Sequence, residues 1–345
     1  MIWRIRMDKR TPGKNNKYAY MLVSFAIMLA AGIVAAVCMG KYSVTPLESL
    51  RILLGLRDGS SEMTINVVMR LRIPRILASV MVGAALSVSG AVYQGVFRNP
   101  LVSPDYLGIT SGASVGAAIG ILLSLNTAFI SLFAFAGGIA AMLLAMSLPV
   151  LLRNNSNIML VMSGVIVGAA MSSVLGFIKY LADPESQLAS IIYWTMGSFS
   201  YVSSRELLVI APIVLLPMAV LFGMSWWIDV LSMGENDARA LGANVSFVRS
   251  LALGCATLLT SASVCIAGTI GWIGLIIPHV GRLLAGPANR RLLPLAALAG
   301  GLFMLMADTI TRTISVSEMP VGILTGALGV PFYCWLLYKQ RETLL

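Results

Sequence analysis

Long stretches without a single Lys, Arg, Asp or Glu constrain this chain more than any other feature of its sequence. A helix needs about 20 apolar residues to cross a bilayer, and most of the stretches reach that length. They cover residues 18–40, 76–97, 106–152, 154–178, 186–204, 207–228, 250–281, 292–307 and 319–338. The sequence therefore predicts an all-α, polytopic membrane protein.

The composition excludes several other classes of protein. Of the 345 residues, 58% are apolar and 11% are charged, whereas about 25% of a typical soluble protein is charged. The net charge of +10 does not indicate a nucleic-acid partner, because the basic residues lie at the ends of the apolar stretches and form no patch interleaved with aromatic residues. The four cysteines form no CxxC pair and lie inside apolar stretches, so we interpret them as packing residues and predict no metal site.

The number of spans depends on two long stretches and one polar one. The 106–152 stretch has a polar break near residues 124–127 and is long enough for two spans. In the 250–281 stretch, the glycines after residue 267 and Pro278 indicate a full span followed by a short, broken helix. The 186–204 stretch mixes Tyr, Trp and Ser, which is typical of an interfacial segment. The prediction is ten transmembrane helices, some of them short re-entrant or broken helices.

The distribution of basic residues predicts the orientation. Six of the first 17 residues are Lys or Arg, which places the N-terminus in the cytoplasm. With ten spans the C-terminus, which carries Lys339 and Arg341, is cytoplasmic as well. We thus expect a basic cytoplasmic extension at 1–17, followed by one transmembrane domain at 18–345 in the cytoplasmic (inner) membrane.

The sequence contains no recognisable energy source of its own. It lacks a Walker A motif, so we expect no ATP or other cofactor on this chain, and it lacks the HExxH and GxSxG motifs of membrane-embedded enzymes, so no catalytic residue is predicted. Ion-driven transporters place ionisable groups inside their spans. Here Asp308 is the main such group, and Arg312, one turn later, could pair with it. Two hypotheses follow: a pathway driven by a separate motor protein, or a stand-alone transporter coupled to an ion gradient through Asp308.

The 229–249 segment is the predicted docking element for such a motor. Gly234 and Gly242 can bound a short helix, on which Ala238 and Leu241 would share a small apolar face. On these features alone, a solvated connector is an equally good interpretation.

Several short motifs also occur in a fixed order along nearly the whole chain. They are Arg72-Ile-Pro74-Arg75, Val82 to Gln94, Phe97 to Pro104, Leu107-Gly108, Gly234 to Gly242, Gly271 to His279, Ala307-Asp308 and Pro320-Val-Gly322. In these motifs the chain resembles the FecCD-type permeases of binding-protein-dependent ABC importers, which take up iron-siderophores, haem and cobalamin.

The resemblance implies a function, a set of partners and an internal symmetry. Two permease subunits, identical or related, would form the pathway, and two cytoplasmic ATPase subunits would hold ATP and Mg²⁺ and drive it. An extracytoplasmic binding protein would deliver an iron-siderophore or a similar chelate. The family's inverted repeat would relate spans two to five to spans seven to ten.

The resemblance also assigns roles to residues of this sequence. The ATPase-coupling residues would be Gly234, Glu235, Ala238, Arg239, Leu241 and Gly242. The binding protein would dock on outward-facing arginines, for which headgroup contacts or surface ion pairs are the alternative; they are Arg72, Arg75 and Arg312. A cytoplasmic gate would lie between two pairs, Asn99 with Leu101 and Ser156 with Asn157.

Overall fold

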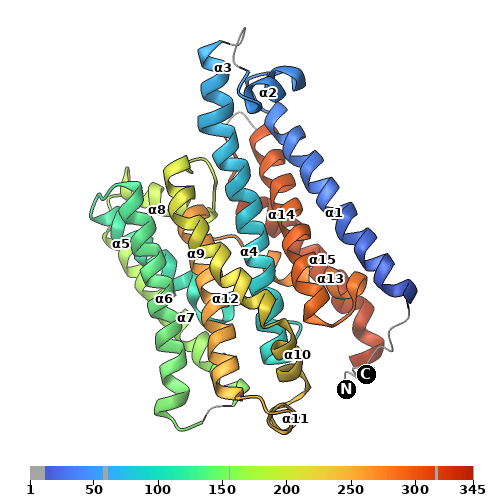
Figure 1. Ribbon diagram of the computed structural model, residues 1–345. Helices are drawn as coiled ribbons and strands as arrows, with labels where there is room; N and C mark the ends of the chain where they lie inside the picture. Colours follow the sequence, from blue (N-terminus) through green and yellow to red (C-terminus); the bar gives the residue numbers. More distant parts are fainter. Residues whose placement is uncertain (1–11, 57–60, 155, 315–317, 345) are drawn as a thin grey trace.

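The computed structural model describes residues 12–56, 61–154, 156–314 and 318–344, and within these ranges the chain is helical with no β-strand (Figure 1). The first half contains α1 (Pro12–Cys38), α2 (Pro46–Leu53), α3 (Glu62–Asn66), the π-helix η1 (Val67–Arg72), α4 (Ile73–Phe97), the 3-10 helix η2 (Pro104–Leu107), α5 (Ile109–Leu122), α6 (Thr127–Leu151) and α7 (Asn157–Leu181). The second half contains α8 (Gln187–Met196), α9 (Ser204–Gly223), α10 (Ser225–Met233), α11 (Glu235–Ala240), α12 (Val245–Ala267), α13 (Ile273–Ala285), α14 (Asn289–Ile314) and α15 (Val321–Leu344).

Seven helical segments of the described chain are long and apolar enough to cross a membrane. They are Asn16–Cys38, Glu62–Phe97, Thr127–Leu151, Ile158–Leu181, Ser204–Gly223, Val245–Ala267 and Asn289–Ile314. Three further apolar helices are shorter, namely Ile109–Leu122, Ile273–Ala285 and Val321–Trp335. A helix of 13 or 14 residues is about 20 Å long at 1.5 Å per residue, which is less than the roughly 30 Å of a bilayer core.

The chain breaks where the sequence predicted. The 106–152 stretch divides between α5 and α6, and the Asn126 side chain caps α6 by accepting a hydrogen bond from Phe129 N at 3.2 Å. The 250–281 stretch divides into the long helix α12 and the short helix α13, with Gly268 at a φ of +67° after the last residue of α12. The polar stretch 186–204 contains the short helix α8.

Helices α4 and α12 form the centre of the bundle. In the apolar part of the α3–η1–α4 helix 78% of residues are buried, and in α12 72%, against 11% in α1. In Figure 1, α4 runs through the middle of the bundle, with α9 and α12 beside it and α14 between it and α1. The outer helices expose Leu, Val and Ile side chains that only lipid or another subunit could cover.

Glycines allow two pairs of helices to approach backbone to backbone. A Cβ added at Gly90 of α4 would lie 2.0 Å from the carbonyl oxygen of Gly274 in α13. At Gly116 of α5 it would lie 2.0 Å from the carbonyl oxygen of Phe133 in α6. Any side chain at either position would separate the helices, and in lipid such close contact is a main source of helix association.

The two ends of the bundle differ in construction. The short helices α2 and α3 lie at one end, and α11 lies at the other, where α4 and α12 also have an end (Figure 1). α1 begins at Pro12, so the last residues of the predicted 1–17 extension are helical. Residues 1–11 lie outside the described residues.

Candidate functional site

Arg75 and Asp308 form a buried ion pair near the α2–α3 end of the bundle. Arg75 lies in the first turn of α4, and Asp308 lies on α14, 233 residues later. Arg75 Nε and Nη2 donate to Asp308 Oδ1 at 2.9 and 2.8 Å, and Nε is 3.1 Å from Oδ2. The Asp308 side chain is fully buried. This fork-to-carboxylate geometry joins the two helices and neutralises both charges.

A second carboxylate holds the remaining arm of Arg75. Nη1 lies 2.7 Å from Oε2 of Glu318, in the segment before α15. The Ser200 hydroxyl, in the α8–α9 connection, donates to the same Oε2 atom. Unlike Asp308, Glu318 has a side chain that is 35% exposed. Arg75 therefore has one inner partner that water cannot reach and one outer partner that it can.

Two further arginines donate hydrogen bonds to the carbonyls at the C-terminal end of α1. Arg72, at the end of η1, donates from Nη1 to the carbonyls of Val37 at 2.6 Å and Cys38 at 3.3 Å. Arg312 of α14 donates from Nη2 to the carbonyl of Ala36. The last carbonyls of a helix have no partner within the helix and carry partial negative charge, so cationic donors from η1 and α14 stabilise α1 there.

The three arginines that were predicted to receive the binding protein on the outer side are buried within the chain. Arg72, Arg75 and Arg312 are only 5, 8 and 6% exposed. Buried guanidinium groups need hydrogen-bond acceptors, and α1 and Asp308 supply them. Arg312 was also the predicted partner of Asp308; the structure gives that carboxylate to Arg75. A docking role for the arginines stays a prediction.

The short helix predicted between Gly234 and Gly242 is present at the other end of the bundle, and its docking role stays a prediction. It is α11, and the glycines on either side of it, Gly234 and Gly242, have φ angles of +132° and +81°. Both values lie in the region that favours glycine, which is why the sequence alone was enough to locate both ends of the helix.

The two apolar residues for which the sequence predicted a shared face on α11 differ in exposure. Ala238 is fully buried, whereas Leu241, at the C-cap, is 51% exposed. The Arg239 side chain is 67% exposed, so a partner could reach both Arg239 and Leu241. Ala238 instead fixes the helix to the bundle.

An ion pair holds α11 against α12. Arg249 Nη2 donates to Oε1 of Glu235, and Arg239 Nη2 lies 3.5 Å from Oε2 of the same carboxylate. The hydrogen bond from Arg249 lowers the pKa of the Glu235 carboxyl. Because that pKa is lowered, the stabilisation is complete at neutral pH and declines only as the pH falls through the lowered value.

The hydrogen bonds of the predicted gate residues are local. Asn99 Oδ1 accepts a hydrogen bond from Leu101 N at 2.9 Å, and the Ser156 hydroxyl caps α7 by accepting from Met159 N at 3.2 Å. None of the hydrogen bonds of the described residues joins one pair to the other. Asn157 is the first residue of α7, and its side chain is not among those that the structure describes. The gate stays a prediction.

The sequence analysis did not identify three groups that contact the site residues, namely Glu318, Ser200 and Arg249. Glu318 is visible as an acid just before the last apolar stretch, but no spacing connects it to Arg75 or Ser200. Arg249 follows Glu235 by 14 residues, too far for a pairing within one helix. These contacts depend on how separate helices pack.

Comparison with known proteins gives a consistent result. Residues 28–339 match the FecCD transport family. The molybdate import system permease protein MolB of Haemophilus influenzae is 35% identical, over 95% of this chain and 98% of the relative. A probable iron chelatin transport system permease protein of Helicobacter pylori is 38% identical, over 93% of this chain and 99% of the relative.

A solved structure agrees with the fold. It is described as an inward-facing conformation of a metal-chelate type ABC transporter. Its chain is 33% identical and superposes with a TM-score of 0.84, covering 93% of this chain and 99% of the other.

Proposed function

The chain belongs to the FecCD transport family, and from this we propose that it is the membrane-spanning permease subunit of an ABC importer that brings a metal chelate into the cytoplasm. ATP and Mg²⁺ would bind to two separate ATPase subunits. A second permease subunit, identical or related, would complete the pathway, and an extracytoplasmic binding protein would deliver the cargo. The protein would reside in the cytoplasmic (inner) membrane.

We further propose that the chain crosses the membrane ten times, with both termini in the cytoplasm. The seven long apolar helices and the three shorter ones support this count. The first turn of α1 and the last turn of α15 lie in the same half of Figure 1 as α11, which supports a common side for both termini and the docking helix. An inverted repeat of spans two to five and seven to ten is part of the same proposal.

The observation that carries the function is the construction of α11. Glu235 and Ala238 attach this short helix to the bundle, while Arg239 and Leu241 project from it. An ATPase that binds the projecting side chains could move α12 through the attached ones. We assign ATPase coupling to the α11 segment from Gly234 to Gly242.

The principal buried charge inside the spans argues against the ion-coupled alternative. A carboxylate that carries protons or sodium has to exchange them with water. Asp308 is fully buried and bound by the Arg75 fork, which keeps water from reaching the carboxylate. This observation favours an external energy source.

The cargo is proposed from the relatives. The Helicobacter pylori relative is named for iron chelatin and the Haemophilus influenzae relative for molybdate. We propose an iron-siderophore as the first candidate, with haem and cobalamin after it. We also propose that the cytoplasmic gate for this cargo lies between two pairs of residues, Asn99 with Leu101 and Ser156 with Asn157.

A reconstitution experiment tests the function. The purified chain is placed in liposomes alone, and separately with the ATPase and binding protein of its own system, and uptake of a labelled ferric siderophore is measured. We expect concentrative uptake only with the partners and ATP. Uptake by the chain alone, driven by a proton or sodium gradient, would replace the proposal with the ion-coupled alternative.

The docking proposal needs Glu318 to move. An acidic side chain of the binding protein could pair with Arg75 by displacing Glu318, which is exposed on its outer side, while Asp308 keeps the inner arm. Arg72 and Arg312 would then support the site rather than bind the partner directly.

Glu318→Gln should therefore strengthen binding of the binding protein about fivefold, since an exposed competing charge is worth up to about 1 kcal/mol. Surface plasmon resonance on the reconstituted importer would measure the affinity. Glu206→Gln, which alters an N-terminal capping carboxylate of α9, provides the matched control. Weaker binding by Glu318→Gln would mean that Glu318 itself contacts the partner, contrary to the displacement.

A further inference from the structure

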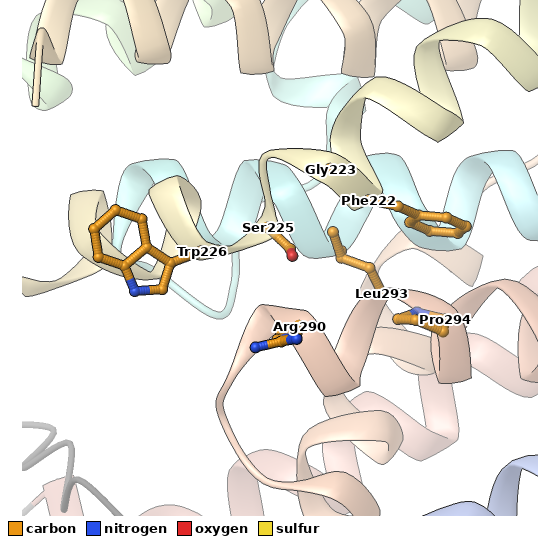
Figure 2. Close-up of a pocket in the computed structure, with 7 residues that line it drawn as sticks. All are labelled: Phe222, Gly223, Ser225, Trp226, Arg290, Leu293 and Pro294. Carbon is orange, nitrogen blue, oxygen red and sulfur yellow. The ribbon is translucent and has the colours of Figure 1, made fainter.

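A pocket lies where α9 ends and α14 begins. At Met224 the chain leaves α9 and turns into α10, and the turn leaves a cavity of about 320 Å³ against the first turns of α14 (Figure 2). Its walls include Phe222, Ser225, Trp226, Arg290, Leu293 and Pro294.

The pocket combines one cation and one hydroxyl with an apolar wall. Figure 2 shows the Ser225 hydroxyl and the Arg290 guanidinium on facing sides of the opening, with Phe222 and Leu293 beyond them. Arg290 is exposed. Within the described part of the chain, no hydrogen bond or ion pair engages its guanidinium, and none engages the Ser225 hydroxyl. A guanidinium and a hydroxyl across a narrow opening are suited to a phosphate.

Asp229, the acidic residue of α10, does not neutralise the Arg290 guanidinium. Asp229 Oδ1 accepts hydrogen bonds from Asn289 N at 2.7 Å and Asn289 Nδ2 at 2.8 Å. Its charge thus stabilises the N-terminus of α14, where an anion is favoured. The positive charge of Arg290 is left available.

The depth of the pocket matches that of lipid headgroups. The apolar span Ser204–Gly223 ends at the pocket, and the span Asn289–Ile314 begins there. Trp226 is 51% exposed at this level, the depth that Trp side chains favour in membranes. Leu215, seven residues before Phe222 and so on the same face of α9, is 58% exposed. Apolar side chains on this face of α9 therefore extend from the pocket towards the membrane interior.

We propose that this pocket binds the phosphate of an anionic phospholipid, with Arg290 and Ser225 on the phosphate and the acyl chains along the exposed face of α9. Basic pockets between transmembrane helices are a recognised setting for anionic headgroups. The inference requires only that α9 and α14 span a bilayer, so it does not depend on the cargo. Because α10 leads directly into α11, a bound lipid would also stabilise the position of α11 on the bundle.

Native mass spectrometry of the purified full chain tests the proposal. The wild type, Arg290→Gln and Arg291→Gln are titrated with phosphatidylglycerol and, separately, with phosphatidylcholine. Arg291 is the matched control, because it is adjacent but lies over the Tyr18 ring of α1 at 5.8 Å. We expect Arg290→Gln to bind one phosphatidylglycerol at least about fivefold more weakly, Arg291→Gln to match the wild type, and phosphatidylcholine to bind poorly.

A second measurement covers the case in which Arg290→Gln folds poorly. Phosphatidylglycerol with brominated acyl chains should quench the part of the fluorescence that Trp226→Phe removes, and a large excess of inorganic phosphate should not relieve the quenching. Equal phosphatidylglycerol affinity in all three proteins would overturn the proposal. Absence of this quenching, with a change of the Trp226 fluorescence on adding inorganic phosphate alone, would also overturn it, because the site would then bind free phosphate and not a lipid.

Discussion

Arg75→Met should destabilise the protein by about 3–5 kcal/mol, the usual cost of leaving a buried charge without its partner. The substitution would leave the Asp308 carboxylate fully buried, with its hydrogen-bonding fork removed. Thermal unfolding in detergent, followed by the fraction that remains monodisperse on size exclusion, would show the loss. An unchanged unfolding midpoint would mean that the pair contributes nothing to the α4–α14 contact.

A double substitution separates the structural role of Arg75 from its proposed role in docking. Arg75→Met with Asp308→Leu replaces the ion pair with apolar side chains, and such replacements are often neutral or stabilising. We expect the unfolding midpoint to recover. If the binding protein docks on Arg75, affinity for it should stay low in the double variant. Recovery of both stability and docking would show that the role of Arg75 is structural only.

Leu241→Asp combined with Arg239→Glu should lower uptake at least tenfold while leaving the unfolding midpoint unchanged. Both side chains project from α11, and the ion pair of Arg239 with Glu235 is exposed to solvent, so their replacement should cost little stability. Each contributes one of the two features, apolar surface and positive charge, that a bound ATPase could use. Uptake and stimulated ATPase activity in proteoliposomes are the measurements.

The matched control for this variant is Leu241→Met combined with Arg239→Lys, which keeps both features. It should transport within about twofold of the wild type. Normal uptake by the charge-reversed variant would remove the coupling assignment from α11. Loss of uptake together with a lower unfolding midpoint would instead point to a structural role for the loop.

Local chemistry explains why so much of the architecture could be predicted. Apolar runs of about 20 residues indicate helices, because a segment that crosses a bilayer has to satisfy its backbone hydrogen bonds internally. The ends of α5, α6, α12 and α13 follow polar or glycine breaks that are visible in the chain. The bounds of α11 follow from two glycines, because few other residues adopt their φ angles. Seven helices of the described chain are long enough to cross a membrane, and three apolar helices, in α5, α13 and α15, are shorter, so the count of ten transmembrane helices stays a prediction.

The partners of Arg72 and Arg75 could not be predicted from the sequence. A basic residue beside an apolar stretch indicates the edge of the membrane. It does not indicate whether the side chain faces outward to a partner or inward to an acceptor. Arg72 lies 35 residues after Val37, and Arg75 lies 233 residues before Asp308, so neither pairing follows a helical or turn spacing.

The amino-acid sequence alone was enough to establish a helical membrane protein, the position of the short helix α11 and the resemblance to a permease family, because each of these depends on residues close together in the chain. Only the tertiary structure could decide the partners of the buried arginines, which side chains project from α11, and the pocket between α9 and α14. Each of these is set by the approach of helices distant in sequence, and that approach depends on packing across the whole bundle.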